Sequence, residues 1–320
     1  MGPSPWKRGP CQVVVFAMAV GVLVGLTPPT SGAEPREAAG QEEIPQYPVD
    51  VRAVALDVLV TDHKGRFVSG LKRDDFTVLE SGVPQELSFF TAGRTPVTVL
   101  VLLDSSASVR SNLLSVQKAA NRFIDKLPRG DRARIGFFHN RVVFGPRFTD
   151  DMEEHSAMIK QMRPQRSTHL YDALVESLEK LEPVPRRKAL LIFSDGEDEG
   201  SQTTMEDALE AARRSHVSVY SVGLMGWSTE GGMHTNQGLL EEIARFTGGR
   251  AFFPDEPKQM RKAFDRIRDE LHSQYRMGYV PKARSEEPTQ WREIQVKLTR
   301  REDLVVRSRL GYYGGRKQAP

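Results

Sequence analysis

One stretch decides the fold class: residues 96–108, which read PVTVLVLLDSSAS. Seven residues from Val97 to Leu103 are apolar except for one threonine, and Asp104, Ser106 and Ser108 follow them. An uninterrupted apolar run is typical of a strand that is covered on both faces. The stretch therefore predicts a central strand of a mostly parallel sheet, with polar side chains at its carboxyl end.

Helical and strand patterns alternate after this strand. Further strands are predicted at Ala133–Phe138, Val142–Phe144, Ala189–Phe193, Val217–Val222 and Arg250–Phe253, and helices at Leu113–Leu127, Leu170–Leu181, Met205–Arg214, Leu239–Phe246 and Gln259–Leu271. Such alternation predicts an α/β domain built on a doubly wound, mostly parallel sheet. We place this Rossmann-like domain at residues 96–272.

The segments on either side of the α/β domain have strand patterns only. Before it, strands are predicted at 49–60, Phe67–Val68, Phe76–Leu79 and Leu87–Phe90; after it, at Tyr275–Val280, Ile294–Leu298, Leu304–Val306 and Leu310–Tyr313. Neither set of strands is large enough to bury a core alone. We expect residues 49–95 and 273–314 to pair into one small β-sandwich, with the α/β domain inserted in it and residues 315–320 as a tail.

The N-terminal segment has the pattern of a secretory signal. Basic residues at Lys7 and Arg8 precede an apolar run from Val13 to Leu26, and small residues follow up to Ala33. We interpret residues 1–33 as a signal peptide and residues 34–48 as a polar linker, so the protein is expected to be exported, periplasmic or secreted. An uncleaved membrane anchor is the alternative, although the run is shorter than the ~20 residues of a spanning helix.

Composition excludes several classes of protein. The 320 residues are 39% hydrophobic and 27% charged, with 45 basic and 42 acidic side chains and a net charge of +3. These values are typical of a globular protein, and so small a net charge argues against a nucleic-acid-binding surface. The single cysteine excludes a disulfide scaffold and a four-cysteine zinc site.

Oxygen-bearing side chains recur at the predicted strand ends. They are Asp104, Ser106 and Ser108 after the first strand, Asp195 after Ala189–Phe193, and Thr168 before the helix at Leu170. Ligands of open α/β sheets bind at the carboxyl ends of the strands. Two carboxylates and three hydroxyls suit Mg²⁺, or Mn²⁺ in its place.

These residues resemble the metal-ion-dependent adhesion site of von Willebrand factor type A domains. The Asp104-x-Ser106-x-Ser108 motif, Thr168 and the Ser-Asp-Gly-x-Asp motif at Asp195 occur in the order of that family, and the resemblance covers about residues 96–272. It implies that all five residues hold a divalent cation (Mg²⁺, with Mn²⁺ or Ca²⁺ possible), Asp195 mainly through water. It also implies a protein partner that offers Asp or Glu to the metal, and a last helix, Gln259–Leu271, that can shift. One departure is that Arg166-Ser167 precede Thr168, where family members often have glycines.

Binding is the function that this pattern favours, and two alternatives stay open: a metal-dependent hydrolase that uses the same carboxylates, and a structural domain whose metal locks the loops. The sequence lacks nucleophile-elbow, phosphate-loop and dinucleotide motifs, so we expect no enzyme. We interpret Arg129-Gly130-Asp131 as a turn. The basic residues Arg186–Lys188, Arg261, Lys262, Arg266 and Arg268 are expected to be solvated, and the loop at 225–236 is a candidate for setting specificity.

Overall fold

The computed structural model describes residues 53–107, 109–110, 113–165, 167–223, 237–282 and 290–314. All of them belong to one compact unit, Pro48–Pro320. The predicted signal peptide, linker and tail, the 225–236 loop, Arg166 and Ser108 lie outside the described residues.

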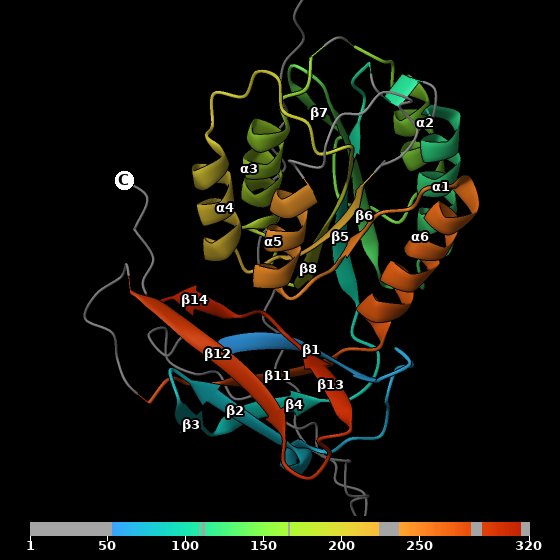
Figure 1. Cartoon of the computed structure of the whole chain (residues 1–320). Helices are drawn as coiled ribbons and strands as arrows, with labels where there is room; N and C mark the ends of the chain where they lie inside the picture. Colours follow the sequence, from blue (N-terminus) through green and yellow to red (C-terminus); the bar gives the residue numbers. More distant parts are fainter. Residues whose placement is uncertain are drawn as a thin grey trace, which may run out of the picture. The chain divides into compact units, whose positions relative to one another are not determined.

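A six-stranded sheet forms the centre of the α/β part (Figure 1), in the order β10-β9-β8-β5-β6-β7. Its strands are β5 (Val97–Asp104), β6 (Arg132–Phe138), β7 (Val142–Phe144), β8 (Arg187–Ser194), β9 (Ser218–Gly223) and β10 (Ala251–Phe252). Every pair is parallel except β6 with β7. All eight residues of β5 are buried, as expected for a strand covered on both faces. The predicted fold class is thereby confirmed.

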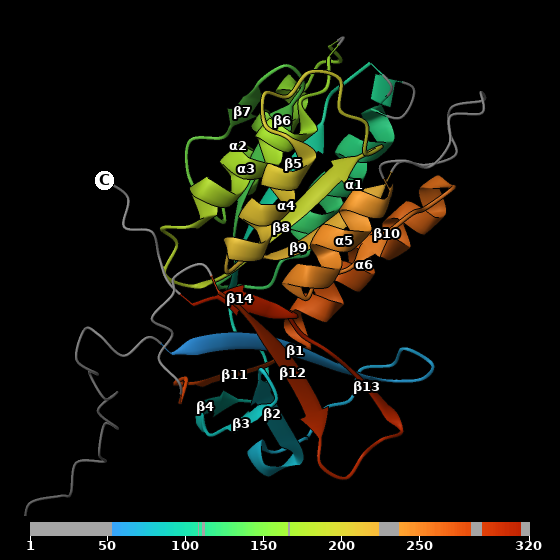
Figure 2. The same cartoon turned by 60° about the vertical axis from the view of Figure 1, so that its left-hand side comes forward.

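Helices cover both faces of this sheet (Figures 1 and 2). They are α1 (Leu113–Asp125), α2 (Met152–Gln161), α3 (Leu170–Leu181), α4 (Met205–Arg214), α5 (Gln237–Thr247) and α6 (Pro257–His272). Val99 and Val101 of β5 share a core with α1, α2 and α6, whereas Leu100 and Leu102 share one with α3, α4 and α5. The alternation of side chains along β5 thus supplies both cores.

The sequence analysis did not predict α2. Only His155, Met158 and Ile159 of its ten residues are buried, so its apolar stripe is short. The helix begins at its N-cap Asp151, whose carboxylate accepts hydrogen bonds from the N–H groups of Glu153 and Glu154. Capping therefore defines a helix that its hydrophobic periodicity does not reveal.

The flanking strands form two four-stranded antiparallel sheets, β13-β1-β11-β4 and β14-β12-β2-β3, that share one core. Their bounds are β1 (Val54–Asp62), β2 (Phe76–Glu80), β3 (Val83–Gln85), β4 (Leu87–Thr91), β11 (Tyr275–Tyr279), β12 (Trp291–Leu298), β13 (Leu304–Arg307) and β14 (Gly311–Tyr313), with a 3-10 turn (Arg73–Asp75) before β2. Leu56 of β1 pairs with Met277 of β11, and Val78 of β2 pairs with Val296 of β12. The segments before and after the α/β part therefore build the sandwich together, as predicted (Figure 2).

Two details of the sandwich differ from the prediction. Phe67 makes one isolated bridge, to Thr61, so no strand forms at Phe67–Val68. The short strand β3 was not predicted because its side chains are largely exposed, which leaves no hydrophobic alternation to detect. The domain boundaries stay predictions.

Buried arginines connect the sandwich to the α/β part. Arg187, expected to be solvated, is 5% exposed. It lies 3.0 Å from the Asp57 carboxylate and donates a hydrogen bond to the carbonyl of Leu271. Arg309 donates to the carbonyls of Arg213 and Ser215 at the end of α4. Burial lowers the pKa of Arg309 to about 10, so its guanidinium stays protonated at neutral pH. The carbonyls at the C-terminal end of α4 favour this positive charge.

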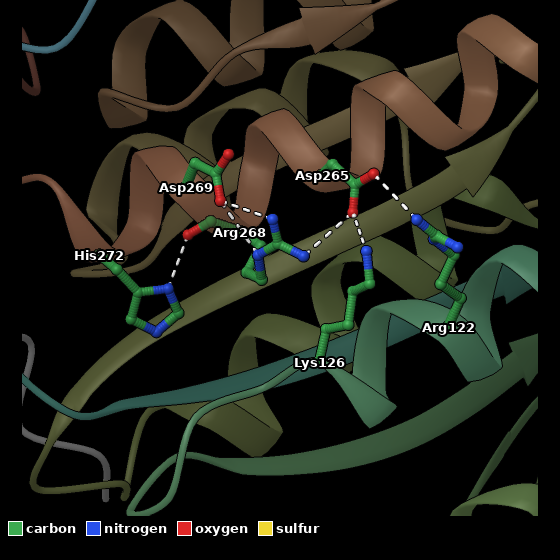
Figure 3. Close-up of polar contacts among 6 residues, drawn as sticks. All are labelled: Arg122, Lys126, Asp265, Arg268, Asp269 and His272. Atoms are coloured by element: carbon green, nitrogen blue, oxygen red, sulfur yellow. Dashed lines mark hydrogen bonds and ion pairs between the residues drawn. The ribbon is translucent and has the colours of Figure 1, made fainter.

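Ion pairs connect α6 to α1 on the outer surface (Figure 3). Asp265 accepts hydrogen bonds from Lys126 at 3.1 Å and Arg268 at 3.0 Å, and Arg122 lies 3.5 Å away. All four side chains are at least one-fifth exposed. Such surface pairs contribute little to stability, so α6 is held mainly by its apolar face.

Candidate metal site

Asp104 is the last residue of β5 and is fully buried. One carboxylate oxygen, Oδ1, accepts a hydrogen bond of 2.8 Å from the N–H of Ser106, and Oδ2 accepts one of 2.7 Å from the hydroxyl of Ser194. Ser194 ends the neighbouring strand β8, and the parallel register of β5 with β8 brings it beside Asp104. Two strand ends therefore fix the orientation of one carboxylate.

The surroundings of Asp104 are electrostatically negative. Burial, followed by the negative charge of Asp195, raises the pKa of Asp104 to about 7. The same Asp195 raises the pKa of Glu197. Hydroxyl and N–H donors from Ser194 and Ser106 act in the opposite direction. A bound cation would stabilise the negative charges of two neighbouring carboxylates in this position.

Hydrogen bonds connect the loop after β5 to its neighbours on either side. The N–H and hydroxyl of Ser105 both donate to the carbonyl of Phe138, at the end of β6, at 2.8 Å. The carbonyl of Ser105 accepts from the N–H of Gln165, and Ser106 bridges to that same residue. Ser106 is 2% exposed, so its hydroxyl is held within this edge of the sheet.

Thr168 lies on the loop that leads into α3 and is 3% exposed. Its carbonyl accepts a 2.8 Å hydrogen bond from the N–H of Glu199, in the loop after β8. The Asp198 carboxylate accepts bonds from the N–H of Tyr171 and the hydroxyl of Ser201. The carboxylate of Asp172 in turn accepts the N–H groups of residues 202 and 203. These contacts join the loop before α3 and the start of that helix to the loop after β8.

Four of the five predicted ligands lie at this carboxyl edge of the sheet: Asp104 at the end of β5, and Ser106, Thr168 and Asp195 on the loops. The fifth, Ser108, is outside the described residues. Among the described residues, no group of three or more His, Cys, Asp or Glu side chains forms a metal cluster. The predicted set has only two carboxylates, and its other members are hydroxyls, so it would not form such a group. Because its donors are all oxygens, the set fits a hard cation such as Mg²⁺. The sequence analysis missed Ser194 as the residue that positions Asp104.

Two other features that the sequence analysis considered have structural contacts. Gly130 of Arg129-Gly130-Asp131 has a φ of +94°, and Asp131 is 2% exposed. The Asp131 carboxylate accepts the N–H of Val97 and lies 2.6 Å from the ring of His272. The tripeptide is therefore a turn whose acid is buried in the fold. His169, beside Thr168, lies 3.6 Å from the Asp172 carboxylate.

A mostly parallel sheet with helices on both faces and oxygen side chains at its carboxyl edge defines a Rossmann-like α/β domain. The chain belongs to the von Willebrand factor type A domain family, whose model matches residues 98–266, just over half of the chain. No curated protein matches it.

Similar solved structures cover the domain to different extents. A von Willebrand factor type A protein from Catenulispora acidiphila is 11% identical, with a TM-score of 0.49, over 85% of this chain and 76% of that one. The vWF domain of the type V pili tip protein Mfa5 from Porphyromonas gingivalis is 13% identical, with a TM-score of 0.46, over 56% and 96%. BatB from Bacteroides thetaiotaomicron is 19% identical, with a TM-score of 0.41, over 54% and 99%.

None of the helices in the described part of the chain combines the length and the apolarity that a membrane crossing requires.

Proposed function

We propose that this chain is an exported module that binds a partner protein through a divalent cation and recognises an acidic group on that partner. The observation that carries the proposal is the placement of Asp104, a fully buried carboxylate at the open end of a parallel sheet. Ser106 and Ser194 orient it, and Asp195 adds a second negative charge. A cation would offset the cost of burying this carboxylate.

The cation would be held by Asp104, Ser106, Ser108, Thr168 and Asp195. Mg²⁺ is the expected ion, with Mn²⁺ or Ca²⁺ as substitutes. With only two carboxylates around it, the bound ion would retain positive charge to attract a carboxylate of the partner. The chain's own part is to hold these oxygens in place, since Ser194 orients Asp104 and the bond from Glu199 positions the Thr168 loop.

A binding role needs no general base, whereas hydrolysis does. Two histidines at this edge of the sheet have other contacts: His139, directly after β6, accepts a hydrogen bond from the N–H of Asn140, and His169 lies beside Asp172. We therefore propose a non-catalytic function. Turnover of ester or phosphate substrates that depends on Asp104 would overturn it in favour of the hydrolase. Export is part of the proposal and rests on the signal pattern of residues 1–33.

The first test measures metal binding by calorimetry and thermal unfolding, with Mg²⁺, Mn²⁺ or Ca²⁺ compared with a chelator. Saturating metal is expected to raise the melting temperature, and Asp104→Ala is expected to abolish the rise while the protein stays folded. Asp303→Ala is the matched control, because Asp303 is an exposed carboxylate paired with Arg301. An unchanged melting temperature of the unmutated protein in saturating metal would refute the proposal.

The second test concerns the partner. The protein is used to capture binders from an extract of exported proteins, with Mg²⁺ or with a chelator. Partners recovered only with Mg²⁺, and lost with Asp104→Ala, would support recognition through the metal. The same partners in both conditions would support the structural alternative, in which the metal only locks the loops.

A further inference from the structure

A cavity of about 140 Å³ lies away from the metal site, beside the last turns of α6. It is lined by Leu59, Thr61, Gly65, Arg250, Arg266, Glu270, Val305 and Arg307. A single water needs ~10–15 Å³ of such space, so the cavity has room for several waters or a small ion. Positive charge is in excess in this lining, because it contains three arginines and one glutamate.

The three arginines surround the carboxylate of Glu270, which is fully buried. Arg266 Nε donates to Oε1 at 3.1 Å, Arg250 Nη1 lies 3.5 Å from the same oxygen, and Arg307 Nη2 donates to Oε2. One carboxylate balances only one of three guanidinium charges. The lining therefore carries two excess positive charges beside a space that admits an ion.

The guanidinium groups retain donors that Glu270 does not use. Each carries five N–H donors in a planar fork, whereas a carboxylate has about four acceptor sites. The Nε of Arg307 is buried and has no hydrogen-bond partner. An unsatisfied buried donor of this kind is costly.

Aromatic rings limit how these arginines can reorient. The guanidinium of Arg266 lies 4.0 Å from the ring centroid of Phe67, and that of Arg250 lies 5.0 Å from that of Phe252. Arg266 Nη2 also donates to the carbonyl of Gly65 at 2.6 Å. Stacking occupies the face of a guanidinium and leaves its N–H edge for an acceptor. The donors are therefore organised before any ligand arrives, which reduces the entropy cost of binding.

We propose that this cavity binds a small tetrahedral oxyanion of the phosphate or sulfate class through Arg250, Arg266 and Arg307. Such an anion offers several acceptor oxygens in directions that guanidinium forks match. It would balance the excess positive charge of the lining. The side chain of Arg250 is 50% exposed, and those of Arg266 and Arg307 are 27% and 26% exposed, so the anion has access from solvent.

The test is titration calorimetry with inorganic phosphate, and separately sulfate, in the presence of a chelator and at constant ionic strength made up with chloride. Two or three charge-assisted hydrogen bonds correspond to a dissociation constant of about 1 mM. Arg250→Gln is expected to weaken phosphate binding by roughly ten- to a hundredfold. O-phosphoserine is titrated in parallel: tighter binding of the free ion assigns the site to free anions, and tighter binding of the ester to a phosphate carried on a larger molecule.

The matched control is Arg214→Gln. Arg214 is 41% exposed, pairs with Glu210 and lies over the ring of Tyr313, so it resembles Arg250 in charge, exposure and contacts but does not line the cavity. The control is expected to bind phosphate as the unmutated protein does, and so is Asp104→Ala. Glu270→Gln removes the carboxylate charge that competes with phosphate for the three arginines, so this variant is expected to bind phosphate more tightly.

Absence of saturable phosphate and sulfate binding by the unmutated protein would overturn the proposal. Equal weakening by Arg250→Gln and Arg214→Gln would also overturn it, because it would indicate nonspecific attraction to a basic surface. Arg250→Gln decides the matter even if Glu270→Gln fails to fold, since it changes an exposed side chain.

Discussion

The substitution Glu80→Gln tests how the two ends of the described chain are joined. The side chain of Glu80, on β2, is 5% exposed. Its Oε1 accepts a 2.6 Å hydrogen bond from Arg292 of β12, and its Oε2 accepts bonds of 2.7 and 2.8 Å from the hydroxyls of Tyr279 and Tyr312. Tyr279 belongs to the other sheet of the sandwich. Glu80 precedes the α/β part and its three partners follow it, so one carboxylate links both sheets and both flanking segments.

The expected cost follows from these contacts. Burial, and the hydrogen bond to Glu80, raise the pKa of Tyr279, and the same causes raise that of Tyr312 to about 12, so both hydroxyls stay protonated and donate. Replacing the carboxylate with an amide leaves the side chain of Arg292, 9% exposed, without its counter-charge. Breaking one partner of a buried pair costs about 3–5 kcal/mol. At ~2–4 °C per kcal/mol, the melting temperature is expected to fall by about 6–20 °C.

The assay is urea unfolding followed by circular dichroism, with a thermal scan as a second measure. Asp303→Asn is the control, because it breaks the exposed pair with Arg301 and is expected to cost less than ~1 kcal/mol. Tyr279→Phe removes one of the three donors and is expected to cost about 1–3 kcal/mol. If Glu80→Gln costs no more than Asp303→Asn, the carboxylate does not hold the sandwich together and the reasoning is wrong.

Three further outcomes follow from the structure. Ser194→Ala removes the 2.7 Å hydrogen bond to Asp104 and should weaken Mg²⁺ binding by about 10–100-fold in calorimetry; unchanged affinity would show that Ser194 does not position Asp104. Arg309→Lys should cost about 2–4 kcal/mol in urea unfolding, because one ammonium cannot replace the guanidinium on the carbonyls of Arg213, Ser215 and Gly311; a cost below ~1 kcal/mol would contradict this role. Burial lowers the pKa of His155, so its contribution to stability is complete above its unfolded pKa of about 6.5 and is lost as the pH falls towards the lower folded value. His155→Gln should therefore reduce the loss of unfolding free energy between pH 7 and pH 5, and an undiminished loss would assign that pH dependence to other groups.

The predictable elements share one physical property. Helix α3 begins and ends at the predicted residues, Leu170 and Leu181, because its apolar side chains recur at helical spacing. Strand β5 is recognisable because burial on both faces favours apolar side chains at consecutive positions, here six of eight. Helix α2 and strand β3 escape prediction because few of their side chains are buried. A hydrophobic pattern indicates which side chains are buried. It does not reveal an element that is defined by a helix cap or by strand pairing at the edge of a sheet.

The candidate metal residues could be located from the sequence for a topological reason. Parallel strands end at the same edge of a sheet, so Asp104 and Asp195 are neighbours wherever β5 and β8 are. The role of Ser194 depends on the register between these strands, which no local pattern contains.

By itself, the sequence determined the α/β class, the insertion of that part between two strand-rich segments, and the residues that carry oxygen at the strand ends. These follow from local periodicity and from the geometry that every parallel sheet shares. Tertiary structure alone decided which charges meet. Arg250 and Arg307 belong to other segments than Glu270 of α6, yet both converge on its carboxylate, and the sequence prediction of a solvated Arg187 was wrong. A side chain's partners depend on distances between elements, which folding sets and sequence spacing does not.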